Sequence, residues 1–296
     1  MTKHILLMDG PDAPGLIYHV TSVLFRHGLN IIRNDEYVSP DGRFFMRTEF
    51  EAGPRQAGPR QVGPVKAGVE FDTPDGQAIL NELRDVLPTE VTLRLNPKAK
   101  KNIVVFVTRE HHCLGELLIR YGFDELDADI LAVVSNYNTL QPLVSKFGIP
   151  FHFISHENKT REEHEEAVQR TLAIYQPDYL VLAKYMRVLT PGFVSQYNNR
   201  IVNIHHSFLP AFVGASPYRQ AYERGVKIIG ATAHFVNNDL DEGPIIAQNV
   251  QEVDHRHTAA DMSTMGRDVE KIVLSQALKL VFNDRVFIHQ NRTIIL

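Results

Sequence analysis

Residues 201–217, IVNIHHSFLPAFVGASP, are the most informative part of this chain for its fold. Apolar Val202 and Ile204 predict a buried strand, and side chains alternate between the two faces of a strand. Asn203 and His205 therefore project to the same side, at the strand end where a proline-containing loop begins. An amide and an imidazole held side by side can polarise a carbonyl group and handle a proton. We therefore expect a catalytic site at this strand end.

A second polar cluster, ATAHFVNNDLDEGPIIAQ at residues 231–248, supplies the other half of the candidate site. It contributes the carboxylate of Asp241, and its TAHFV stretch predicts a strand that brings His234 close to that carboxylate. His234 has two interpretations, a supporting residue of the site or a histidine of the core or surface. Gly243 and the proline after it predict the turn that returns the chain to the sheet.

Apolar runs alternate with helical patterns from residue 103 to the C-terminus. The predicted strands lie at 103–107, 130–135, 151–154, 179–183 and 201–204, and the predicted helices at 113–121, 140–147 and 161–175. This order predicts an α/β domain with a doubly wound, mostly parallel sheet, in which ligands bind at the carboxyl ends of the strands. A closing helix is expected at 259–281. Its packed face is expected to carry Val269, Ile272, Val273, Gln276 and Leu280.

The first 95 residues form a separate pattern. Strands are predicted at 5–8, 31–37, 44–50, near 69–71 and at 91–95, and helices at 16–25 and 76–87. We interpret this as a β-α-β-β-α-β unit, the ferredoxin-like α+β arrangement. The repeated GPRQ of residues 53–68 predicts a loop insertion without a catalytic role. Residues 96–102, NPKAKKN, are the expected linker between domains 1–95 and 103–296.

Composition narrows the classes of function. The chain has 296 residues, enough for two domains with their own cores, and a net charge of −4 that gives no reason to expect nucleic acid or an anionic membrane as partner. The single cysteine, Cys113, excludes an internal disulfide and is expected to pack at a helix start. No signal peptide or membrane span is recognisable, so cytoplasmic residence is expected. We assign no metal, since His205 and His206 are expected on opposite faces of their strand.

The motifs N-I-H-x-S-x-L-P-x-x-x-G and H-F-V-x-x-x-L-D-x-G-P-I-I resemble the superfamily of folate-dependent formyltransferases and hydrolases. The resemblance runs from about residue 102 to the C-terminus. It implies that the superfamily's catalytic Asn, His and Asp fall on Asn203, His205 and Asp241. In that superfamily the amide stabilises an oxyanion, but which of the other two groups moves which proton stays open here.

The same resemblance implies a folate pocket. The segment LAKYMRVLT at 182–190 is similar to the superfamily's L-A-x-x-M-R-x-L loop, which places Met186, Arg187 and Leu189 at the folate ring, with Val236 on the opposite wall. The alternative is that the methionine and leucine simply pack a helix start. No tightly bound cofactor is implied, and 10-formyltetrahydrofolate would be the substrate.

Two turns distinguish among the relatives. The first turn of the second domain reads TREHHCLG, where Glu110 would repel a phosphate, and it resembles the formyltetrahydrofolate deformylase branch. In the first domain, the D-x-P-G turn resembles the ACT domain family, which deformylases of this type carry at their N-terminus. Asp9, Asp12 and Gly15 could frame an amino-acid effector pocket there, or form a plain turn between strand and helix.

The resemblance therefore implies hydrolysis of 10-formyltetrahydrofolate to tetrahydrofolate and formate, which would control one-carbon folate pools for purine and amino-acid metabolism. ACT-like domains commonly pair, so a homo-oligomer is expected. Two alternatives stay open. One is a formyltransferase that passes the formyl group to an amine acceptor, and the other is a non-catalytic sensor of folate and an amino acid.

Overall fold

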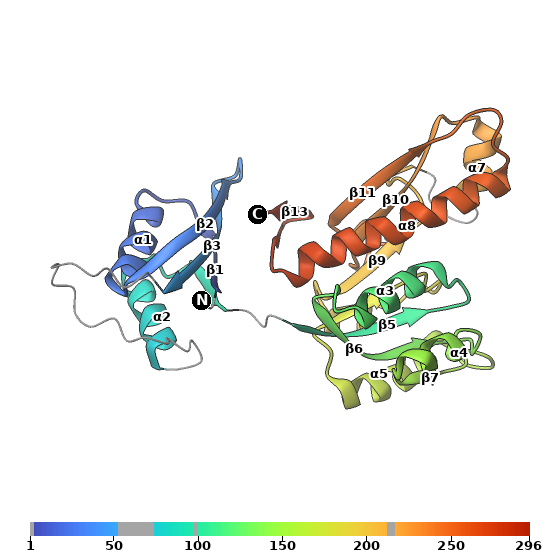
Figure 1. Cartoon of the computed structure of the whole chain (residues 1–296), viewed down its shortest axis with the longest axis horizontal. Coiled ribbons are helices and arrows are strands. Elements are labelled where there is room, and N and C mark those ends of the chain that lie inside the picture. The colour runs from blue at the N-terminus through green and yellow to red at the C-terminus, as the bar shows by residue number, and fades with distance from the viewer. Residues whose placement is uncertain (1–2, 53–73, 97–99, 212–216) are drawn as a thin grey trace. The chain divides into compact units, whose positions relative to one another are not determined.

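The computed structural model describes residues 3–52, 74–96, 100–211 and 217–296. The chain divides into two compact units, Met1–Lys98 together with Leu296, and Ala99–Ile295 (Figure 1). The predicted insertion at 53–68, the predicted strand near 69–71 and residues 97–99 of the expected linker lie outside the described residues.

The first unit is a four-stranded sheet with two helices on one face (Figure 1). Its elements are β1 (Lys3–Pro11), α1 (Leu16–Arg26), β2 (Leu29–Val38), β3 (Arg43–Ala52), α2 (Pro74–Val86) and β4 (Thr92–Leu95). The strand order is β2-β3-β1-β4, and every neighbouring pair is antiparallel. Leu16, Val20 and Val23 recur at helical spacing on α1 and pack into a core with Leu83 of α2. The described elements confirm the predicted β-α-β-β-α-β order.

The second unit is built on a seven-stranded sheet of order β11-β10-β9-β8-β5-β6-β7. The strands are β5 (Lys101–Val107), β6 (Ala128–Ser135), β7 (Phe151–Phe153), β8 (Tyr179–Leu182), β9 (Ile201–His205), β10 (Ile228–Phe235) and β11 (Ile245–Glu252). The five strands from β5 to β9 are parallel, whereas β10 and β11 run antiparallel to their neighbours. The prediction of a mostly parallel α/β sheet is confirmed.

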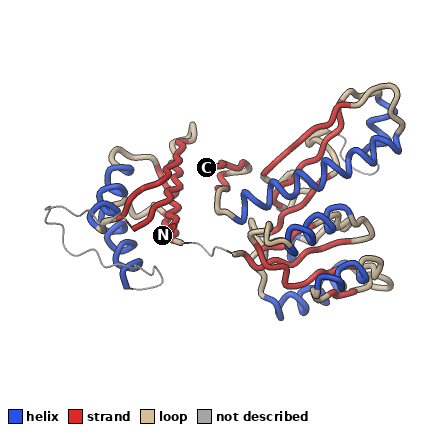
Figure 2. Tube along the Cα trace, in the orientation of Figure 1, coloured by secondary structure: helices blue, strands red, loops and turns tan. Residues whose placement is uncertain are grey.

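Helices cover both faces of this sheet (Figure 2). They are α3 (His112–Gly122), α4 (Gln141–Val144) followed by a 3₁₀ turn (Ser145–Phe147), α5 (Arg161–Tyr175), α6 (Pro191–Gln196), α7 (Pro217–Arg224) and α8 (Ala259–Phe282). A small hairpin of β12 (Val286–His289) and β13 (Arg292–Ile295) ends the chain. Along β5, Val105 packs with α3 and α8, while Val104 and Phe106 pack with α5 and α6. This alternation is the physical basis of a doubly wound sheet.

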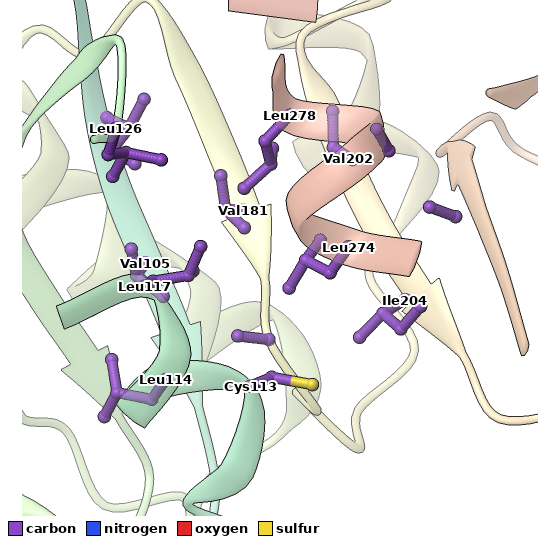
Figure 3. Close-up of a cluster of buried hydrophobic side chains, with 14 of the residues drawn as sticks. Val105, Cys113, Leu114, Leu117, Leu126, Val181, Val202, Ile204, Leu274 and Leu278 are labelled. Carbon is purple, nitrogen blue, oxygen red and sulfur yellow. The ribbon is translucent and has the colours of Figure 1, made fainter. Parts of the chain in front are cut away.

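The core beneath α8 shows how the closing helix packs. Leu274 and Leu278 of α8 meet Leu114 and Leu117 of α3 above the strands (Figure 3). The expectation that Ile272 and Gln276 belong to the packed face is wrong, because both residues are exposed, Ile272 to 43%. No helix among the described residues has the length and apolar character needed to cross a membrane.

Candidate active site

The carboxyl end of β9 carries the predicted amide and imidazole. Strand β10 pairs antiparallel with β9, so that His234 faces Asn203 directly. Facing residues on antiparallel neighbours are close enough for their side chains to bond, and Asn203 Nδ2 lies 3.1 Å from His234 Nε2. The register of the two strands therefore joins His234 to the site.

The hydrogen bonds of His234 define the orientation of the Asn203 amide. His234 Nδ1 lies 2.8 Å from the carbonyl oxygen of Phe235, so this nitrogen carries the proton and donates. Burial lowers the pKa of His234, which favours the neutral ring. Nε2 of a neutral ring protonated at Nδ1 is an acceptor, and it takes a hydrogen bond from the Asn203 amide. The second N–H of that amide bonds no residue in the described part of the chain and can donate to a ligand.

Asp241 lies in the turn between β10 and β11, with a left-handed backbone of φ 58°. Its Oδ1 lies 3.2 Å from His205 Nδ1 and 3.7 Å from His234 Nε2. Burial acts to raise the pKa of Asp241, but the hydrogen bond from His205 and the charge of that ring outweigh it, and the pKa is lowered. Gly243 holds the turn close, since a Cβ there would lie 1.7 Å from the oxygen of Phe235. The turn thus delivers an ionised carboxylate to the histidine.

His205 is bonded on one side of its ring and unsatisfied on the other. Its Nδ1 faces Asp241, and its buried Nε2 has no hydrogen-bond partner among the described residues. A carboxylate on one ring nitrogen orients the imidazole and leaves the other nitrogen for proton transfer. Most buried polar atoms of native proteins are hydrogen-bonded, and a ligand in the cavity could provide the partner of His205 Nε2.

The loop after His205 is held by side chains of two neighbouring strands. Thr232 Oγ1 donates to the carbonyl of Ser207 at 2.9 Å and accepts from the backbone N–H of Leu209 at 3.0 Å. Gln248 Nε2 donates to the same hydroxyl at 2.9 Å. These bonds hold the chain where it leaves β9, so the position of His205 does not depend on the strand ladder alone.

A cavity of about 330 Å³ opens at these side chains. Its walls are residues 184–189, which follow β8, and residues 236–241, which follow β10, and its base is residues 203–206 with His234. This is the crevice at the carboxyl ends of the strands where ligands of open α/β sheets bind. The four residues predicted to contact folate, Met186, Arg187, Leu189 and Val236, all line the cavity.

His206 does not lie where the sequence predicted. Its ring stacks on that of His205, with centroids 5.0 Å apart and planes at 21°, instead of projecting to the opposite face. The reason is that β9 ends at His205, so the alternation of a strand does not extend to the next residue. Burial and the charges of Lys184 and His205 lower the pKa of His206 to about 4, which keeps this ring neutral near neutral pH.

A buried ionic cluster beside the cavity was missed by the sequence analysis. We call Glu270, Lys184, His112 and Tyr218 the Glu270 cluster. The carboxylate of Glu270 accepts from His112 Nε2 at 2.8 Å, from the Tyr218 hydroxyl at 2.6 Å and from Lys184 Nζ at 3.1 Å. Glu270 shares a helical face with apolar Leu274 four residues later, and a glutamate on such a face is the signal that could have revealed it.

Three residues, His112, Cys113 and Glu270, place possible metal ligands within 4.8 Å of one another. Glu270 is already bonded to three protein donors, one of them the ammonium of Lys184, which disfavours a second cation nearby. Burial, and the charge of Glu270 after it, raise the pKa of the Cys113 thiol. The donors of this group fit an ion pair better than a metal site.

The expected effector residues lie at the start of the first unit. Asp9 is in β1 and not in the turn, and its carboxylate accepts from Arg43 of β3. The backbone N–H of Asp12 donates to the carbonyl of Gly42 at 2.8 Å. Gly15 has φ 91° and precedes α1, a left-handed conformation that glycine adopts readily.

Comparisons with known families separate the two units. The ACT domain family matches residues 4–61, and the Formyl transferase family matches residues 101–278. A solved structure of glycinamide ribonucleotide transformylase 1 from Symbiobacterium toebii resembles part of the chain, with a TM-score of 0.65 and 29% identity. It covers 68% of this chain and 96% of its own.

Similarity over the whole length is found with deformylases. The formyltetrahydrofolate deformylase of Escherichia coli strain K12 is 53% identical over 297 residues, covering 100% of this chain and 99% of the relative. The crystal structure of a formyltetrahydrofolate deformylase from Pseudomonas syringae pv. tomato has a TM-score of 0.88 and 37% identity, and covers 99% of this chain and 94% of its own. With this identity along the whole chain and both domains in the same order, the protein belongs to the formyltetrahydrofolate deformylase family.

Proposed function

We propose that this protein hydrolyses 10-formyltetrahydrofolate to tetrahydrofolate and formate, with Asn203, His205 and Asp241 as the catalytic residues and His234 as their support. The observation that carries the proposal is the free side of His205. Its buried Nε2 faces no described partner, while Asp241 holds the other ring nitrogen and an oriented amide lies beside it. Membership of the deformylase family supplies the substrate class.

The proposed reaction follows from these positions. Water adds to the formyl carbon, and the oxygen of the formyl group becomes an oxyanion that accepts the free N–H of Asn203. Asp241, ionised because its pKa is lowered, takes the proton that the water loses. The bond from carbon to N10 then breaks, and His205, as an imidazolium whose Nδ1–H is bonded to Asp241, gives its Nε2 proton to N10 as it leaves. Asp241 then releases the proton taken from water and the ring takes up one proton from solvent, so both groups return to their starting states.

The folate ring is proposed to lie between the two walls of the cavity. Met186 on one wall and Leu240 on the other are each 60% exposed, which is unusual for apolar side chains of this size and suits the faces of a flat ring. Arg187, Leu189 and Val236 complete the predicted contacts. No tightly bound cofactor is part of this proposal.

The first unit is proposed to be a regulatory domain. Its assignment to residues 1–95, with a linker at 96–102 and a catalytic domain at 103–296, follows the sequence analysis. We place the amino-acid effector at the pocket framed by Asp9, Asp12 and Gly15, where the carboxylate of Asp9 accepts from Arg43. A homo-oligomer, cytoplasmic residence and a role in the one-carbon folate pool complete the proposal. Light scattering at working concentration tests the oligomer, and a monomer would contradict it.

The experiment that tests the reaction compares two neighbouring carboxylates. Formate release from 10-formyltetrahydrofolate is measured without any amine, for the wild type, Asp241→Asn and Glu242→Gln. We expect Asp241→Asn to lose roughly 10³-fold in rate, because it removes both the base and the group that orients His205. Glu242 is exposed and lies outside the cavity lining, so Glu242→Gln is expected to keep the wild-type rate. A folded wild type that binds folate but releases no formate would overturn the proposal.

A further inference from the structure

The Glu270 cluster is buried in spite of its charges. The side chain of Glu270 is only 1% exposed, and that of Lys184 only 9%. Burial acts to raise the pKa of Glu270, but the hydrogen bond from His112 and the charge of Lys184 hold it at about 2. An ion pair in such a place is a poor source of stability, because desolvation offsets the attraction between its charges. Its presence beside the cavity therefore calls for another explanation.

The backbone at Lys184 points to a function. Lys184 has φ 66°, a left-handed conformation that favours glycine and strains a residue with a side chain. Thr108 Oγ1 donates to the carbonyl of Lys184 at 2.8 Å and pins it there. Strained positions of this kind cluster at active sites and ligand clamps. Lys184 lines the reaction cavity, and its Nζ lies 3.1 Å from the carboxylate of Glu270.

The cluster adjoins the catalytic histidine through one aromatic ring. His206 stacks on His205, and the ring of Tyr218 lies next, with its centroid 6.4 Å from that of His206. Gly266 of α8 makes room for Tyr218, since a Cβ at that position would lie 2.1 Å from the tyrosine ring. The ring of Tyr218 therefore joins the Glu270 cluster to His206, beside the reaction cavity.

We propose that Lys184, held by Glu270, blocks the approach of an amine acceptor to the formyl carbon and so leaves water as the acceptor. This inference rests on the proposed function. An amine acceptor must reach the carbon beside Asn203 and His205, and the walls after β8 and β10 are assigned to the folate ring. Among the described residues, Lys184 and His206 line the cavity beside His205.

The test measures how the formyl group divides between water and an added amine. Wild type, Lys184→Gly and Lys184→Met are given labelled 10-formyltetrahydrofolate and an excess of glycinamide as the probe, and the ratio of formylglycinamide to formate is measured. Lys184→Gly suits the left-handed backbone and opens space, so we expect its ratio to rise by about 10-fold or more. Lys184→Met keeps most of the bulk and removes the charge, and we expect its ratio to stay within about 2-fold of the wild type.

Two results would overturn this inference. One is a folded Lys184→Gly with an unchanged ratio, and the other is a Lys184→Met whose ratio rises as far as that of Lys184→Gly. Lys184→Gly could fail to fold because Glu270 loses its cation. In that case the double variant Lys184→Gly/Glu270→Gln is used, and the same rise in the ratio of formylglycinamide to formate is expected. Formate release by the wild type decides the proposed function separately, because the ratio is interpreted only for an enzyme that releases formate.

Discussion

The second unit contains two pairs of a carboxylate and a histidine that differ in their access to the cavity and in the number of donors that their carboxylate accepts from. Asp241 faces His205 at 3.2 Å, and Glu270 faces His112 at 2.8 Å. The Asp241 side chain is 13% exposed and borders the cavity, whereas Glu270 is buried and accepts from three donors. One ring nitrogen of each histidine, Nε2 of His205 and Nδ1 of His112, is buried without a hydrogen-bond partner among the described residues, but only His205 lines the cavity. We therefore call Asp241 and His205 the open pair, because a ligand in the cavity can reach it, and Glu270 and His112 the saturated pair, because its carboxylate accepts from three donors.

The largest expected effect is a loss of formate release, and it is tested by changing the histidine of each pair to glutamine. His205→Gln should lower the rate of formate release by about 10²–10⁴-fold, because it removes the proton donor from the open pair. His112→Gln should change that rate by less than about 10-fold and should instead lower stability, because it leaves a buried carboxylate short of a donor. Single-turnover formate release and urea unfolding of both variants measure the contrast. Equal losses of rate in the two variants would show that the comparison is false.

The second effect tests the saturated pair by stability. Glu270→Gln is expected to lower the free energy of unfolding by roughly 3–5 kcal/mol, since it leaves the buried ammonium of Lys184 without its counter-charge. The double variant Lys184→Met/Glu270→Gln removes both charges and should recover part of that loss. Urea denaturation of the three proteins gives the coupling. If the double variant lost as much free energy of unfolding as Lys184→Met and Glu270→Gln lose together, the two side chains would not be coupled, which would argue against an ion pair.

A smaller effect concerns the amide of the open pair. His234→Leu removes the acceptor that orients Asn203, so the amide is free to turn its oxygen toward the oxyanion. We expect a fall in kcat of about 10–100-fold with little change in KM, the pattern of an interaction made only in the transition state. His234→Gln offers an oxygen acceptor and is the matched variant that should recover part of the rate. A change in KM alone would place His234 in folate binding instead.

The open pair could be predicted from sequence because its geometry is local. Alternation along one strand puts Asn203 and His205 on one side, and the motif after β10 brings Asp241. The order of strands and helices is equally local, since each apolar run and each helical period lies within one segment. Only the register of β9 against β10, which places His234 opposite Asn203, needed the structure.

The saturated pair could not be predicted in the same way. Glu270, His112 and Tyr218 lie on α8, α3 and α7, and their meeting depends on how three helices pack over the sheet. A sequence period shows that Glu270 shares a face with apolar residues, but not which donors meet it there. The expected packing of Ile272 failed for a related reason, because a period close to the helical one leaves the edges of the buried face undetermined.

The smallest expected effect is a dependence of stability on pH that arises where the two pairs meet, at His206. Burial, the charge of Lys184 and that of His205 lower its pKa from 6.5 to about 4. Between these two pKa values the unfolded chain binds more protons than the folded one, so the free energy of unfolding falls as the pH is lowered from about 6.5. Above about pH 6.5 His206 causes no such loss of stability. His206→Phe keeps an aromatic ring on His205 but does not titrate, so at pH 5 it should lose less stability relative to pH 7 than the wild type, by on the order of 1–2 kcal/mol. Urea denaturation of both proteins at pH 5 and pH 7 measures this difference in stability. Equal losses in the wild type and in His206→Phe would mean that the folded chain protonates His206 as readily as the unfolded chain does, and that the charge of Lys184 does not act on this ring.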